Sequence, residues 1–94
     1  MLTLTNAAGA HLARKLARAE AAADVAIRFI PKEHGRKRRR WGLRLDTLHP
    51  GDETFVHDGK MVLVLDEAVS ELLTEKTLDV KHSAAGPRLT LHGG

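Results

Sequence analysis

The sequence of 94 residues contains no cysteine and few aromatic side chains. Without cysteine, these residues can form no disulfide bond, thiolate metal site, cysteine nucleophile or cysteine-held cluster. Aromatic residues make up 3% of the chain, namely Phe29, Trp41 and Phe55. Leucine, valine and alanine must therefore fill the hydrophobic core, which is small in a chain of this length.

Long hydrophobic runs are missing as well. The longest nearly apolar stretch is Met61–Leu65, whereas a membrane-spanning helix needs roughly 20 residues. The first residues lack a basic start followed by an apolar segment, so we expect no secretory signal. We therefore expect a single domain over residues 1–94 that is cytoplasmic and has no membrane partner.

Motifs for catalysis and cofactor binding are also absent. Ser70 and Ser83 lie outside the sequence pattern of a nucleophile elbow, and the glycines form neither a P-loop nor a dinucleotide-binding motif. Carboxylates stand at the predicted turns and helix caps, where they are common for backbone reasons. We expect no enzyme activity, no catalytic residue and no cofactor.

Positive charge, in contrast, is concentrated in one segment. Residues 28–44 hold eight Lys or Arg residues against Glu33, although the formal net charge of the chain is only +3. The densest part, here called the basic run, consists of Arg36, Lys37, Arg38, Arg39 and Arg40. One interpretation is contact with nucleic acid or another polyanion, because Lys and Arg neutralise phosphates, with Trp41 stacking on a base. The other is a solvated loop beside a core tryptophan.

A helix is predicted from residue 7 to about residue 22, with Asn6 as its N-cap. Its apolar face consists of Ala8, Leu12, Leu16 and Ala19. A second face, here called the basic stripe, consists of His11, Arg14, Lys15 and Arg18. This stripe extends the anion-binding surface if it lies on the same side of the molecule as the basic run.

Alternating apolar residues predict strands over 2–5, 25–30, 41–46, 54–57, 60–65, 78–82 and 88–91. Pro31 is expected to end the second strand, and residues 32–39 to form a loop. Asp58–Gly59 favours a type I′ hairpin turn, and Asp66 favours a short helix after it, with Val69, Leu72 and Leu73 in the core. This order predicts an α+β fold with a mostly antiparallel sheet.

The order and its residues resemble the HesB-like family, the A-type iron–sulfur carriers. The resemblance is carried by residues 4–8 at the start of the helix, 25–29, 41–45, 55–66 and 78–80. It implies a β-sheet sandwich with an N-terminal helix and one short helix. The family binds iron or an iron–sulfur cluster through one loop cysteine and a Cys-Gly-Cys pair near its C-terminus.

The ligand positions of that family are not matched here. Placing Gly35 on the family's loop glycine puts Arg36 at the cysteine position, and Gly94 stands about where the Cys-Gly-Cys motif would begin. The resemblance therefore implies the fold and not the cluster chemistry.

Three functions remain open from the sequence. The leading hypothesis is a non-catalytic binding module whose basic run binds an anion. The second is a protein-interaction or assembly domain related to iron–sulfur biogenesis, with a protein partner or a homodimer on the sheet surface. The third is a metal carrier that uses histidines and carboxylates, although no metal ligand is assigned because the histidines lack compact metal-binding spacing. They are His11, His34, His49, His57, His82 and His92.

Overall fold

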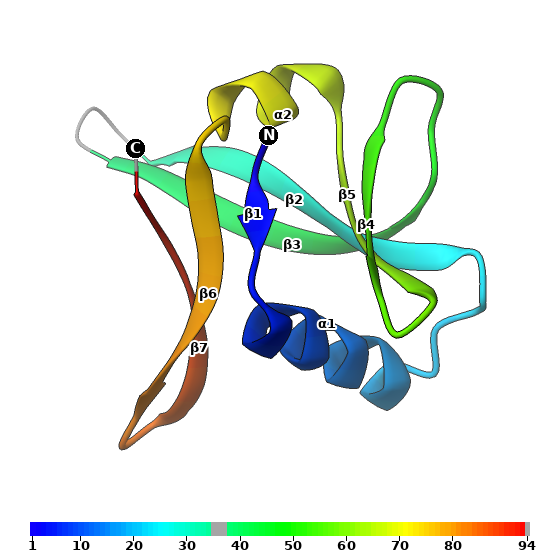
Figure 1. Ribbon diagram of the computed structural model, residues 1–94, viewed down its shortest axis with the longest axis horizontal. Helices are drawn as coiled ribbons and strands as arrows, with labels where there is room; N and C mark the ends of the chain where they lie inside the picture. Colours follow the sequence, from blue (N-terminus) through cyan, green and yellow to red (C-terminus); the bar gives the residue numbers. More distant parts are fainter. Residues whose placement is uncertain (35–37, 94) are drawn as a thin grey trace.

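The computed structural model describes residues 1–34 and 38–93, and for residues 31–34 and 38–40 it describes the backbone alone. Its elements follow the order that the sequence predicts (Figure 1). They are β1 (Thr3–Leu4), α1 (Asn6–Arg18), β2 (Val25–His34), β3 (Arg38–Thr47), β4 (Glu53–His57), β5 (Lys60–Leu65), α2 (Glu67–Leu72), β6 (Lys76–Ser83) and β7 (Gly86–Gly93).

The strands form two sheets. One sheet has the order β1-β6-β7 and the other has the order β3-β2-β5-β4. The pairs β2–β3, β4–β5 and β6–β7 are antiparallel, whereas β1–β6 and β2–β5 are parallel. Figure 1 shows α1 between the β6–β7 hairpin and the β4–β5 hairpin, so the helix packs against strands of both sheets. The predicted α+β class and mostly antiparallel pairing are confirmed.

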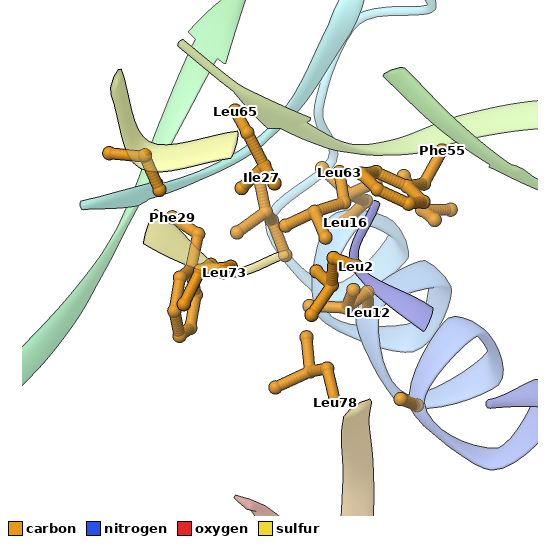
Figure 2. Packing of buried hydrophobic residues seen from close by; sticks show 13 residues of the cluster. Leu2, Leu12, Leu16, Ile27, Phe29, Phe55, Leu63, Leu65, Leu73 and Leu78 are labelled. Carbon is orange, nitrogen blue, oxygen red and sulfur yellow. The ribbon is translucent and has the colours of Figure 1, made fainter. Parts of the chain in front are cut away.

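The core lies where α1 meets the two sheets (Figure 2). On α1, Ala8, Leu12 and Leu16 are fully buried, as the helical spacing predicts. They pack against a cluster from the other elements that includes Leu2, Ile27, Phe29, Phe55, Leu63, Leu65, Leu73 and Leu78. Leucines supply most of this cluster, which agrees with the scarcity of aromatic residues.

Both ends of α1 differ from the prediction. The N-cap is Thr5 instead of Asn6: its Oγ1 accepts a hydrogen bond from the backbone N–H of Ala8 at 3.1 Å. The same hydroxyl donates to Asp79 Oδ1 at 2.7 Å, which ties the start of the helix to β6. At the other end the helix stops at Arg18, about one turn before residue 22, and the predicted core residue Ala19 is exposed.

Backbone hydrogen bonds at residues 20 and 21 explain the early stop. The N–H of Glu20 donates to the carbonyl of Ala17, and the N–H of Ala21 donates to the carbonyl of Leu16, both at 3.1 Å. This is the Schellman pattern of a helix C-terminus. Glu20 takes the left-handed position, with φ of 54°, which usually belongs to glycine.

The strand β2 continues through Pro31 to His34, and β3 begins at Arg38. The prediction that Pro31 ends the strand and that residues 32–39 form a loop is therefore wrong for residues 31–34 and 38–39; residues 35–37 lie outside the described residues. Within the described register, β2 pairs with β5 only at residues 27 and 28. The missing N–H of Pro31 therefore costs no ladder bond on that side of β2.

The hairpin and the short helix are confirmed. Asp58 and Gly59 both have positive φ, 50° and 77°, as a type I′ turn requires. Asp66 Oδ1 accepts from the N–H of Val69 at 2.9 Å and caps α2. Val69 and Leu73 are buried as predicted, but Leu72 is 43% exposed, because α2 covers the sheet with one face only.

Candidate functional site

The basic stripe lies on the surface of α1. Arg14, Lys15 and Arg18 are exposed and His11 is partly buried. Burial, together with the positive charges of Lys15, Arg14 and Arg18 and a smaller influence of His82, lowers the pKa of His11. A proton is harder to add to His11 because the side chain is partly buried and because the surface around it is already positive.

The structure describes only part of the basic run. Arg36 and Lys37 lie outside the described residues, whereas Arg38, Arg39 and Arg40 supply the first backbone residues of β3. Trp41 follows them and is partly buried. Its ring stacks on Phe29 with the centroids 4.8 Å apart and the planes at 20°. One face of the Trp41 ring is therefore already covered by a core residue.

Part of the basic stripe meets β3 around a surface hollow of about 380 Å³. The lining residues come from the end of α1, from β2 and from β3: Lys15, Arg18, Ala19, Ile27, Leu43, Arg44 and Leu45. Three cations, two from α1 and one from β3, thus line the same hollow as three apolar side chains. The structure brings Lys15 and Arg18 to residues 43–45 of β3, whereas His11 and Arg14 are not among the described lining residues. That the basic stripe and the basic run form one surface stays a prediction.

A second, smaller hollow of about 150 Å³ lies next to the first and shares Leu43 with it. Its other lining residues come from β2, β3, β6 and β7: Phe29, Trp41, Leu78, Leu89, Thr90 and Leu91. Leu43 and Leu45 remain 40% and 48% exposed. The alternation in the sequence identified the face on which they lie but not that this face is left partly open.

Arg28, which the sequence groups with the other cations, is buried, and its guanidinium is already hydrogen-bonded to other residues of the chain. Its Nη1 and Nη2 donate to Asp52 Oδ1 at 3.1 Å and Oδ2 at 2.6 Å. Its Nε donates to Asp46 Oδ2 at 2.7 Å, and Nη2 also donates to the carbonyl of Thr47 at 3.1 Å. These hydrogen bonds from Arg28 lower the pKa of Asp46 and of Asp52. This buried network was not predicted, because nothing in the spacing of the three residues indicates it.

Arg44 differs from Arg28. Its side chain is 61% exposed, and its Nη2 lies 3.6 Å from Asp46 Oδ2. An exposed pair at that separation holds the guanidinium weakly. The guanidinium of Arg44 is therefore open to solvent, whereas that of Arg28 is fully engaged.

The described residues do not fit a metal ion or an iron–sulfur cluster. The chain has no cysteine, and among the side chains that the structure describes, those of residues 1–30 and 41–93, no three His, Asp or Glu converge as metal ligands. His57, one of the histidines considered for such a site, packs against Gly9 of α1. In the part of the chain that the structure describes, no helix is long and apolar enough to cross a membrane.

Comparisons with known proteins identify the fold. No protein-family model matches the sequence, and the curated protein sequences give no match. The crystal structure of Escherichia coli SufA, involved in biosynthesis of iron–sulfur clusters, matches with a TM-score of 0.68 and 24% identity over 98% of this chain and 84% of that chain. The crystal structure of IscA with a 2Fe–2S cluster matches with a TM-score of 0.64 and 24% identity, over 99% of this chain and 85% of that chain. The chain therefore has the fold of the A-type iron–sulfur carriers, which confirms the fold that the resemblance predicted.

Proposed function

We propose that this chain is a non-catalytic binding module that uses the carrier fold without its metal chemistry. Its ligand is an anionic partner, bound where the end of α1 meets β3. The observation that carries this proposal is the hollow that Lys15 and Arg18 of α1 line together with residues 43–45 of β3. Cations from two different elements converge there on a surface that is open to a ligand.

Two arguments support an anion at this surface. The cations Lys15 and Arg18 are exposed, and their positive charge contributes to the lowered pKa of His11. An anion would relieve the repulsion among these cations, so binding gains energy from every charge it neutralises. The backbone of β3 also leads directly from the hollow into Arg40, Arg39 and Arg38. We include these three residues in the proposal as an extension of the surface.

The described residues hold no fitting metal site, and this separates the proposed binding of an anion from cluster transport. SufA is involved in the biosynthesis of iron–sulfur clusters, and the IscA structure contains a 2Fe–2S cluster. In the placement that the resemblance implies, Arg36 stands at the position of the family's loop cysteine. An arginine repels a metal ion and attracts an anion, so the charge at that position agrees with the proposed change of ligand.

The proposal is tested by the salt dependence of anion binding. Fluorescent polyglutamate and a fluorescent single-stranded oligonucleotide are titrated with the protein at low and at physiological salt. We compare the double variant Lys15→Glu, Arg18→Glu with the matched control Lys81→Glu, Arg88→Glu, whose residues are exposed on β6 and β7. Both variants change the net charge equally.

At least one anionic probe is expected to bind, with affinity that falls as salt rises. The change at Lys15 and Arg18 should weaken binding about tenfold or more, and the control should weaken it much less. Equal losses in the two variants would mean that only net charge matters. That result, or no binding by the unchanged protein at low salt, contradicts the proposed function.

A further inference from the structure

The strand β3 lies at the edge of its sheet. In the described part of the chain it pairs with β2 on one side only, and the sheet order is β3-β2-β5-β4 (Figure 1). An edge strand directs alternate N–H and C=O groups away from the sheet, where another strand can bind to them. Leu43, Arg44 and Leu45 are three consecutive exposed residues of this strand.

The larger hollow follows the edge of β3. Neighbouring residues of a strand point to opposite faces of the sheet, yet Leu43, Arg44 and Leu45 all line this one hollow. A hollow lined by both faces of a strand borders the strand's edge. On its other side stand Lys15, Arg18 and Ala19 at the end of α1. An extended chain can therefore lie in the hollow, between the edge of β3 and the end of α1.

The two hollows together fit alternating apolar side chains. They share Leu43, and they continue along β3 from Leu45 to Trp41. Side chains two residues apart on a strand are separated by roughly 6.6–6.8 Å and point to the same face. One apolar side chain of an added strand would rest on Leu45, and the next would rest on Leu43 and Leu89.

The charges of this surface select an acidic partner. Lys15, Arg18 and Arg44 border the larger hollow, so acidic side chains that alternate with the apolar ones would meet cations. A second copy of this chain would bring the same three cations to the interface, and like charges would face one another across a two-fold axis.

A nucleic acid fits this surface less well than a peptide. It has no peptide groups to pair with a strand edge, and Trp41, the aromatic side chain nearest the basic run, is already stacked on Phe29. The floor of the hollow is apolar, with Ile27, Leu43 and Leu45. Apolar side chains of a peptide would be buried there, whereas phosphates would not.

We propose that an acidic peptide in extended conformation, in which acidic and apolar residues alternate, binds as an additional strand along β3. This inference rests on the proposed function and specifies its partner. Main-chain hydrogen bonds to the edge would supply affinity, and the two hollows together with the cations of the larger one would supply specificity.

The test uses a fluorescent peptide in which Glu alternates with Val, together with two derivatives. One derivative is N-methylated on every Glu amide, and the other is N-methylated on every Val amide. In an added strand only alternate N–H groups face β3. One derivative should therefore bind about tenfold or more weakly than the parent, and the other should bind much more like the parent.

Control measurements separate the possible failures. The parent peptide should bind more tightly than polyglutamate, lose affinity with Lys15→Glu, Arg18→Glu and keep it with Lys81→Glu, Arg88→Glu. A Leu43→Asp variant, checked for native structure by circular dichroism, should also lose peptide binding. If both methylated peptides bind like the parent, or if the oligonucleotide or polyglutamate binds better, the added strand is wrong and the proposed function stands.

Two further outcomes overturn the inference in other ways. If no anionic probe binds in a salt-dependent manner, the proposed function fails together with the inference. If light scattering shows that the protein is a dimer whose subunit contacts are abolished by Leu43→Asp, a second copy occupies the edge instead of a peptide.

Discussion

Arg28 holds Asp52 through two parallel hydrogen bonds, with Nη2 2.6 Å from Oδ2 and Nη1 3.1 Å from Oδ1. The side chains are 4% and 2% exposed. Asp52 Oδ2 also accepts from the N–H of His49 at 2.7 Å. This pair therefore anchors the turn between β3 and β4 to β2, and it holds the end of β3 against the sheet.

Replacing Arg28 with Met is expected to lower the free energy of unfolding by about 3–5 kcal/mol, because Asp52 then stays buried without a partner. Arg44→Met is the matched comparison, since Arg44 is 61% exposed and contacts Asp46 at 3.6 Å; it should cost at most about 1 kcal/mol. Urea unfolding of both variants measures the difference. Similar small losses would show that the Arg28 network does not hold the turn.

The same network predicts a loss of stability in acid. Hydrogen bonds from Arg28 lower the pKa of Asp52 and Asp46 below the ordinary value, so the unfolded state binds more protons than the folded state. The stabilisation is present above a pH of about 4, and it is lost as the pH falls through the lowered pKa values. Urea unfolding at a series of pH values should give a shallower acid dependence for Asp52→Asn than for the unchanged protein. An identical dependence contradicts this assignment.

Gly9 is expected to be required for the contact between α1 and β4. A Cβ at this position would lie 2.6 Å from Nδ1, 3.0 Å from Cγ and 3.2 Å from Cβ of His57. Gly9→Ala should gain about 1 kcal/mol from helix propensity but lose about 1–3 kcal/mol to overpacking. Thermal unfolding should therefore show a destabilised protein. In the background of His57→Ala the same change should stabilise it, and a stabilising Gly9→Ala in the unchanged protein would contradict the contact.

Glu20→Gly is expected to stabilise the protein. Glu20 is exposed and has φ of 54° at the Schellman end of α1, a conformation that glycine adopts at little cost. The gain should be about 0.5–1 kcal/mol in urea unfolding. The control is Ala17→Gly in the last turn of the helix, which should lose a similar amount. A loss of stability in both variants would mean that Glu20 makes a compensating contact.

These residues show how far the sequence specifies the fold. Asp58–Gly59 and the cap at Asp66 were predictable, because their conformations follow from local chemistry alone. The end of α1 was not, because a Glu instead of a Gly takes the left-handed position. The path of β2 through Pro31 was not predictable either, since it depends on which sides of the strand carry a neighbour.

The candidate site was predictable only where it depends on local periodicity. The periodicity of α1 placed Lys15 and Arg18 on one face, and the alternation of β3 placed Leu43 with Leu45. Whether those two faces meet depends on the crossing of α1 over the sheet and on the early end of the helix at Arg18. The burial of Arg28 depends on Asp46 and Asp52 from a later turn, and such a pairing leaves no local signal.

Amide chemical shifts measured during a titration show whether an anionic partner binds between the end of α1 and the edge of β3. On addition of the acidic peptide, we expect the shifts of residues 15–19 and 43–45 to move together and saturate. Amides of the β6–β7 turn around Gly86 should stay in place. Shifts that concentrate on that turn, or spread evenly over the chain, would contradict the claim.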